Sequence, residues 1–450
     1  MVRSEKCGLD SPSRGRGGGP DKKTPNRSFD GPRHLLLLEA SSLLKCNMYE
    51  ATEPDARAGA EDPGSTHAFR IAEKSFQRRV TKSSKKTGKG KLVEEVVDLS
   101  DVVDPSCATF DEDGLHRSEN WGEVRRCRRR AAGLDAVVHS FERHPGFFVV
   151  TQAMEDAFAS RLAELCFGDD VLRPPATTNF TRSHNLSMSG LWHAATNDFR
   201  LVVSPKETTT TTASSSSMTT AAGDTPAVTR WSADGTGPAA AEFLRSLRWL
   251  SIGPCYDWTK RIYLKEDAHV PLPDDMKTFA QRVWALVGND RAFDPNAALI
   301  NYYREGDKLC GHQDDAEIDQ TKPLVSISLG CPAVFLMGGE HKNVVPTPIL
   351  LRHGDVAVLS GSARRAFHGL PRIFPADRKH TLVDRHGMPI DYDHHDHGTD
   401  PPGCVRYGQE HAATRPCHEQ QREREHHPSS SPEVSQYLLN CRVNVSIRQV

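Results

Sequence analysis

The sequence predicts an α+β protein with a double-stranded β-helix (jelly-roll) core, supporting helices and disordered polar insertions. Two observations lead to this fold class. Apolar residues recur at helical spacing in two stretches before residue 290. From residue 297 onward, short apolar or alternating runs are separated by Gly, Pro and His-Gly-Asp turns, a pattern typical of antiparallel sheets packed as a sandwich or barrel.

Each helical stretch has a defined start and end. Pro145-Gly146 predicts a turn before a short buried strand over 147–150, and Thr151 can cap a helix that runs to Phe167. A second helix is expected from about Asp274 to Val287, because Gly288 is a typical stop signal. Both helices direct apolar residues to one side, so we expect them to support a sheet.

The strands expected downstream are short and follow one another closely. They are Leu299–Tyr303, Val325–Leu329, Ala333–Met337, Ile349–Leu351, Val356–Leu359 and Val443–Ile447.

Polar stretches divide the chain into an N-terminal region and a folded domain with two inserts. Residues 1–68 are expected to be disordered, 69–140 to be a basic, partly ordered extension, and 141–450 to be the main domain. Low-complexity inserts are expected within that domain at about 204–240, which holds five consecutive Thr and four consecutive Ser, and at about 375–433.

Composition excludes several classes of protein. Hydrophobic residues make up only 37%, so part of the length must be linker or insertion. The net charge is -2, so no global field indicates a nucleic-acid partner. Eleven cysteines without a CxxC pair argue against a zinc ribbon or a secreted disulfide scaffold. The apolar run Leu35–Leu38 is too short to span a membrane. We expect a monomer inside the cell, with nucleus, cytoplasm and mitochondrion left open.

Two local basic clusters, within 69–91 and 125–130, allow two interpretations. Each can be a solvated, flexible arm. Alternatively, each can serve as a nuclear address or bind phosphates.

His-x-Asp occurs three times, and composition alone gives about three such pairs by chance, so context must choose among them. His394/Asp396 lies in the polar insert, where a loop holds a metal poorly. His353-Gly354-Asp355 is typical of a turn between strands. His312 and Asp314 follow a predicted strand, and their spacing of two lets both side chains point to one face.

His368 is the best candidate for a third metal ligand. It follows the predicted strand 356–359 and precedes Gly369. Two imidazoles and one carboxylate on one side of an ion form the facial triad of non-haem iron(II) oxygenases, which leaves adjacent positions open. Zinc held by the same donors is the alternative.

The end of the chain carries a second constellation. On a strand, Arg442, Asn444 and Arg448 share one face. Burying two guanidinium groups requires anions, and a dicarboxylate such as 2-oxoglutarate supplies one carboxylate for each. The alternative is an exposed strand face near the end of the chain.

Taken in order, these motifs resemble the AlkB-type dioxygenases, and most of all the AlkB homologue 1 branch. The motifs are Leu299-Ile-Asn-Tyr-Tyr303, His312-x-Asp314, Pro323 to Gly330, His353-Gly-Asp355, His368 and Arg442-x-Asn-x-x-x-Arg448. The resemblance covers roughly 69–450. Ala316 stands where bacterial AlkB has a base-contacting Asp, so the bacterial substrate range does not carry over.

The resemblance implies a role for each matching residue. It implies that His312, Asp314 and His368 hold Fe(II) and are the catalytic residues. It implies a 2-oxoglutarate pocket formed by Asn301, Tyr303, Arg442, Asn444 and Arg448. It implies that Tyr256, Trp258 and Glu317 bind the substrate, as the wall of the active site that faces the nucleotide (the nucleotide-side wall).

The expected function is therefore oxidative demethylation of N-methylated bases in tRNA or DNA, using Fe(II), 2-oxoglutarate and O2 and releasing formaldehyde, succinate and CO2. The same centre can serve a protein hydroxylase or a histone demethylase. A non-catalytic nucleic-acid-binding module is a third reading, but it would require a broken triad.

Overall fold

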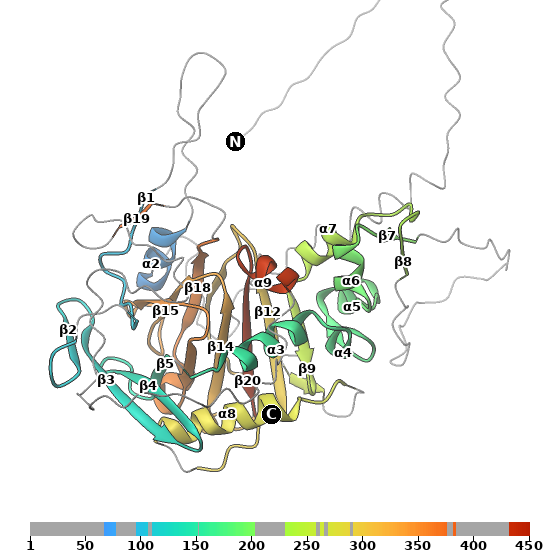
Figure 1. The fold of residues 1–450 in the computed structure, drawn as a ribbon. Coiled ribbons are helices and arrows are strands. Elements are labelled where there is room, and N and C mark those ends of the chain that lie inside the picture. Colours follow the sequence, from blue (N-terminus) through green and yellow to red (C-terminus); the bar gives the residue numbers. More distant parts are fainter. Residues whose placement is uncertain are drawn as a thin grey trace, which may run out of the picture.

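The computed structural model describes ten stretches of the chain (Figure 1): 67–77, 96–106, 110–151, 153–202, 230–257, 262–264, 269–288, 291–375, 381–383 and 432–450. Nearly all of the N-terminal region 1–68 and most of both predicted inserts lie outside these residues, as does His394/Asp396. Within the described residues, no helix has the length and hydropathy needed to cross a membrane.

A ten-stranded sheet forms the centre of the molecule, and all of its pairings are antiparallel. Its strands in spatial order are β2 (Leu115–Ser118), β3 (Gly122–Ala131), β4 (Leu134–Phe141), β5 (Phe147–Thr151), β17 (Val356–Leu359), β14 (Leu324–Gly330), β20 (Arg442–Arg448), β12 (Ala297–Tyr303), β9 (Trp249–Ile252) and β6 (Thr177–Thr178).

A second, four-stranded antiparallel sheet packs against the first. Its order is β13 (Leu309–His312), β18 (His368–Ile373), β15 (Ala333–Met337) and β16 (Thr347–Leu351). The two sheets meet in an apolar cluster that includes Phe147, Val149, Leu359, Met337 and Ile349.

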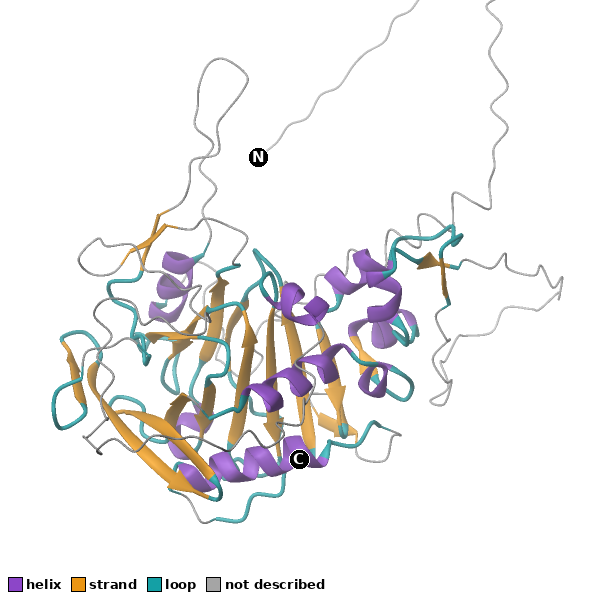
Figure 2. Ribbon diagram, in the orientation of Figure 1, coloured by secondary structure: helices purple, strands orange, loops and turns teal. Residues whose placement is uncertain are grey.

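Helices cover the other face of the large sheet, as Figures 1 and 2 show for α3 (Asp156–Phe167), α8 (Asp274–Leu286) and α9 (Pro432–Leu438). The largest apolar cluster lies between these helices and the sheet. Smaller elements surround this core: α2 (Ala68–Phe76), α4 (Asp169–Leu172), α5 (Asn179–His184), α6 (Leu191–Thr196), α7 (Ala240–Ser246), η1 (Gly361–Arg365), and the short strand pairs β1 (Val96–Asp98) with β19 (Thr381–Val383), β7 (Arg200–Leu201) with β8 (Trp231–Ser232), and β10 (Cys255–Asp257) with β11 (Ile262–Leu264).

Alternation along the central strands separates an apolar face from a polar one. Ile300 and Tyr302 of β12, with Val443 and Val445 of β20, belong to the core under the helices. The residues between them point the other way, toward the small sheet. Tyr303 pairs with Arg442, Asn301 with Asn444, and Asn444 with Ser328 of β14. The space between the sheets is therefore apolar near β5 and β17 and polar near β14, β20 and β12.

The structure confirms the predicted strands from 297 onward and the second helix, which ends at Leu286. The first helix begins later than expected, at Asp156, because Thr151 is the last residue of β5 and pairs with Val137. A flexible arm is wrong for the basic cluster at 125–130. These residues lie on β3, where Val124 is fully buried and Asp135 of β4 pairs with Arg128.

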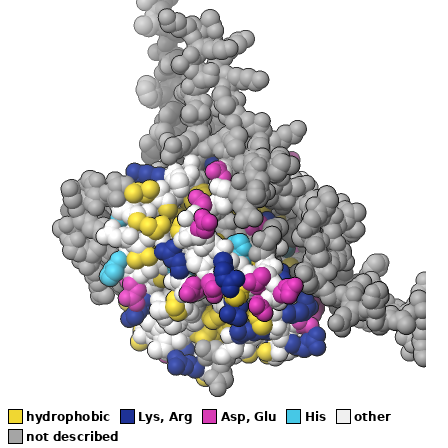
Figure 3. Space-filling view, turned by 90° about the vertical axis from the view of Figure 1, so that its left-hand side faces the viewer, with side chains coloured by type: hydrophobic (Ala, Val, Ile, Leu, Met, Phe, Trp, Pro, Cys, Tyr) yellow, Lys and Arg dark blue, Asp and Glu magenta, His cyan; other side chains and the backbone are white. Residues whose placement is uncertain are grey.

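The large sheet extends upstream of residue 141, through β2, β3 and β4, into the segment expected to be only partly ordered. The expected domain boundaries themselves stay a prediction. On the face shown in Figure 3, basic and acidic side chains lie interspersed, in keeping with the near-zero net charge.

Candidate active site

His312 and His368 lie opposite each other where β13 ends and β18 begins. Each ring is fixed in the same way: Nδ1 donates a hydrogen bond to the carbonyl two residues upstream, that of Cys310 for His312 (3.0 Å) and that of Ala366 for His368 (3.1 Å). A proton on Nδ1 leaves the lone pair of Nε2 available. Both histidines thus present Nε2 to the same space, with ring centroids 4.4 Å apart.

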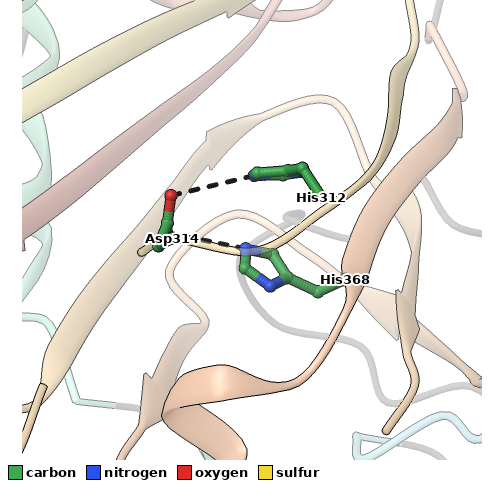
Figure 4. A group of neighbouring side chains, drawn as sticks. All are labelled: His312, Asp314 and His368. Carbon is green, nitrogen blue, oxygen red and sulfur yellow. Dashed lines mark ion pairs between the residues drawn. The ribbon is translucent and has the colours of Figure 1, made fainter. Parts of the chain in front are cut away.

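Asp314 completes the group (Figure 4). One carboxylate oxygen lies 3.9 Å from His312 Nε2 and the other 3.6 Å from His368 Nε2. One potential ligand atom from each of the three residues lies within 4.8 Å of the others. Such separations are too long for hydrogen bonds but suit an ion held between the three atoms.

The protonation states favour metal binding. Burial, with the neighbouring His368, lowers the pKa of His312 to about 4, so its imidazole is neutral at physiological pH. Burial works to raise the pKa of Asp314, but Arg448 and the two imidazoles hold it well below its ordinary value. Metal ligands must be deprotonated before they bind, and these two are. Two histidines and a carboxylate are a donor set that fits Fe(II).

Arg442 lies deep between the sheets and is fully buried. It donates hydrogen bonds to Ser328 Oγ (2.7 Å) and to the carbonyls of Cys331 (3.0 Å) and Leu351 (3.4 Å), so its hydrogen-bond partners among the described residues are all uncharged. Its Nε is buried without a partner. Burial lowers the pKa of Arg442 to about 10. A buried guanidinium with a spare donor fits a ligand carboxylate.

The residues predicted to line the 2-oxoglutarate pocket share the face of Arg442. Register places Tyr303 and Asn301 of β12 beside Arg442 and Asn444 of β20. Asn444 is held by Ser326 Oγ, which accepts from its Nδ2 at 2.7 Å, and by Ser446, which donates to its Oδ1 at 3.0 Å. At the far end of β20, Arg448 lies 3.7 Å from Asp314 Oδ1.

Glu317 lies in the loop that follows Asp314 and connects this loop to Arg448 of β20. Its carboxylate accepts from Arg448 Nη1 (2.8 Å), Arg364 Nη2 (2.5 Å) and the hydroxyl of Tyr263 (3.0 Å). Arg364 also donates to the backbone carbonyl of Asp314 at 2.6 Å. The side chains of Arg364 and Glu317 are each 1% exposed, so this ion pair is fully removed from water.

Comparison with known proteins agrees with this geometry. The sequence profile of the protein family described as the 2OG-Fe(II) oxygenase superfamily matches residues 206–448, more than half of the chain. The chain belongs to this superfamily. The oxygenase is therefore an enzyme that uses Fe(II), 2-oxoglutarate and O2.

Its relatives place the oxygenase in the AlkB-type ALKBH1 branch. It is 32% identical over 339 residues to the DNA N(6)-methyladenine demethylase ALKBH1A of Arabidopsis thaliana, a match that covers 73% of this chain and 89% of the relative. It is 34% identical to the tRNA demethylase abh1 of Schizosaccharomyces pombe, over 31% of this chain and 46% of that protein. It is 36% identical to the human nucleic acid dioxygenase ALKBH1, over 29% of this chain and 33% of that protein.

The structure describes two of the three residues predicted for the nucleotide-side wall, Tyr256 and Glu317. Tyr256 of β10 is half-buried, with its ring 5.2 Å from that of Tyr263 in β11. Trp258 lies outside the described residues. Glu317 is buried beside the triad, where two guanidinium groups bind it. The role of these three residues toward substrate stays a prediction.

Sequence reasoning missed Arg364 and Tyr263 in the oxygenase. Arg364 precedes His368 by four residues, and Glu317 follows Asp314 by three, so complementary charges flank two candidate ligands. That signal was available in the sequence. Tyr263 carries no such signal, since only the pairing of β10 with β11 brings it to Glu317.

Proposed function

We propose that this oxygenase oxidatively demethylates N-methylated bases in nucleic acid, converting 2-oxoglutarate and O2 to succinate and CO2 and releasing the methyl carbon as formaldehyde. The match to ALKBH1A across 89% of that protein carries the proposal, because ALKBH1A is named a DNA demethylase. The yeast relative is named a tRNA demethylase. DNA and RNA are therefore both candidate substrates.

Three residues would hold the iron: His312 and His368 through Nε2, and Asp314 through its carboxylate. Fe(II), when bound, would allow O2 to oxidise the methyl group while 2-oxoglutarate is converted to succinate and CO2. The chain's own contribution is to keep His312 neutral and Asp314 ionised, and to fix both imidazoles through Nδ1. Orientation by a second layer of hydrogen bonds typically strengthens such a site.

Arg442 would bind one carboxylate of 2-oxoglutarate, and Arg448 would lie at the end nearer the metal. The unpartnered Nε of Arg442 and its uncharged hydrogen-bond partners support this assignment. Arg448 forms an ion pair with Glu317. It also lies 3.7 Å from Asp314 Oδ1, so its charge acts on Asp314 as well. Asn301, Tyr303 and Asn444 would line the polar wall between them.

The core would be a double-stranded β-helix. Eight strands support this proposal: β12, β14, β17 and β20 in the large sheet and β13, β15, β16 and β18 in the small one. The chain passes between the two sheets repeatedly as it runs from β12 to β20. Residues 141–450 would be the catalytic domain, and β2, β3 and most of β4 from the preceding extension would continue its large sheet.

The test of substrate class uses purified full-length protein with Fe(II), 2-oxoglutarate and ascorbate. Parallel reactions contain N-methylated tRNA, single-stranded N-methylated DNA oligonucleotides, and methylated histone peptides. Mass spectrometry follows methyl loss, and the Asp314→Ala variant serves as the control. We expect methyl loss from a nucleic acid with wild-type protein alone. Methyl loss or hydroxylation confined to the peptides would favour the protein-modifying reading instead.

A further inference from the structure

Helix α2 begins upstream of the sheets but packs against the small sheet that carries both histidines. His67 caps the helix by accepting from Arg70 N at 3.1 Å. The helix contacts β13, β15 and β18, and Phe69 N donates to the carbonyl of Lys342 at 2.9 Å. Its two buried residues, Phe69 and Glu73, are four positions apart and therefore lie on one face of the helix.

Glu73 reaches the residue that precedes the first metal ligand. Its Oε1 accepts from the backbone N–H of Gly311 at 2.5 Å, and its Oε2 pairs with Arg70 Nη1 at 2.8 Å. The pairing of β13 with β18 is interrupted between Leu309 and His312, so Gly311 lies where the ladder is irregular. Glu73 supplies an acceptor at that point, and its side chain is only 4% exposed.

Phe69 packs behind both ligands. A Cβ placed on Gly311 would lie 2.6 Å from the ring of Phe69, and one on Gly338 would lie 3.0 Å from it, so both glycines make room for the ring. The ring of Phe69 also lies 6.4 Å from that of Phe367, the residue before His368. Phe69 therefore contacts the residue that directly precedes each histidine, and these contacts restrain the backbone from which both side chains extend.

We infer that α2 is a positioning element of the metal site, and that Glu73 and Phe69 set the spacing of His312 and His368. This inference rests on the proposed metal site and adds two upstream residues to it, Phe69 and Glu73, the second of which lies 238 positions before Gly311. Glu73 is a positioning residue, because it acts on His312 through the backbone of Gly311. Its carboxylate oxygens contact Gly311 N and Arg70 Nη1 and are not part of the triad.

The experiment measures binding of Co(II) to full-length apoprotein in the presence of 2-oxoglutarate, by visible absorption. Glu73→Ala removes the acceptor for Gly311, whereas Glu73→Gln keeps an acceptor oxygen and loses only the charge. Lys74→Ala is the matched control, because Lys74 is exposed on the same helix. Gly311→Ala approaches the same contact from β13, since its added methyl group would collide with Phe69. Hydrogen exchange of the β13 amides provides a second readout.

We expect Co(II) affinity to fall by about 10-fold in Glu73→Ala, as is typical when the support of a ligand is removed. Gly311→Ala should show a similar loss. The Co(II) affinity of Glu73→Gln should stay near that of the wild type, and the affinity of Lys74→Ala should equal it. Hydrogen exchange of the amides of residues 309–312 should be faster in Glu73→Ala than in the wild-type protein. Wild-type affinity in Glu73→Ala and Gly311→Ala would overturn this inference alone. Failure of wild-type protein to bind Co(II) would overturn the metal site, and this inference with it.

Discussion

The carboxylate of Asp314 and the guanidinium of Arg448 lie 3.7 Å apart, one in the loop after β13 and the other at the end of β20. This contact joins the two sheets at the metal site. Burial favours a protonated Asp314, but Arg448 and the imidazoles keep the pKa low. An ionised ligand is therefore ready for a cation before one arrives.

Arg442 should govern the affinity for 2-oxoglutarate. Arg442→Gln removes a charged donor in a site that is fully buried, and such hydrogen bonds contribute about 1.5–3 kcal/mol. We expect the Kd for 2-oxoglutarate to rise by about 10- to 100-fold. We also expect 2-oxoglutarate, at the same concentration, to stabilise the variant against heat less than it stabilises the wild-type protein. Arg161→Gln, on an exposed position of α3, is the control. An unchanged Kd in Arg442→Gln would show that the co-substrate binds elsewhere.

Arg364 should stabilise the fold and the metal site together, because it bonds both the Asp314 carbonyl and Glu317. Removing one partner of a buried ion pair leaves the other charge poorly compensated. We expect Arg364→Met to lower the free energy of unfolding by about 2–3 kcal/mol, since Arg448 still binds Glu317. The neighbouring Arg365→Met is a matched control. Arg365 is 63% exposed and pairs with Glu340 at the surface, so its removal should cost under about 1 kcal/mol. Equal losses in the two variants, measured by urea denaturation, would refute the assignment.

Two buried histidines away from the triad should make the fold acid-sensitive. His139 contacts Thr151 Oγ1 at 3.2 Å and His144 contacts Thr347 Oγ1 at 2.7 Å, and burial lowers the pKa of each to about 4. The unfolded chain takes up protons below about pH 6.5 while the folded protein does not, so stability is full above 6.5 and falls toward pH 4.

The slope attributable to each of these histidines should approach about 1 kcal/mol per pH unit in this window. Denaturation curves at pH 7.5, 6 and 5 measure it. His139→Gln/His144→Gln should flatten the decline relative to wild type. A decline of the same steepness in the double variant would assign the acid sensitivity to other groups.

The triad could be predicted because its ligands lie at strand ends that the sequence marks. His312 is the last residue of β13, Asp314 lies just after it, and His368 begins β18. Their places beside predicted strands singled them out among the three His-x-Asp pairs, and the family resemblance agreed. The long-range contacts could not be predicted. Glu73 lies in a segment whose basic residues concealed a helix, and the contact of Glu73 with Gly311 depends on the break in β13. Likewise, the arginines of β3 concealed a strand whose inward residue, Val124, is fully buried.

The central claim is that His312, Asp314 and His368 hold one Fe(II) to which 2-oxoglutarate also binds. Anaerobic titration of apoprotein with Fe(II) and 2-oxoglutarate tests it directly, because a charge-transfer absorption band forms only when both bind at one centre. We predict this band for the wild-type protein and its loss in Asp314→Ala and His368→Ala. The band should be retained in His353→Ala, which alters another His-x-Asp motif of the chain. A band of wild-type intensity in Asp314→Ala and His368→Ala would contradict the claim.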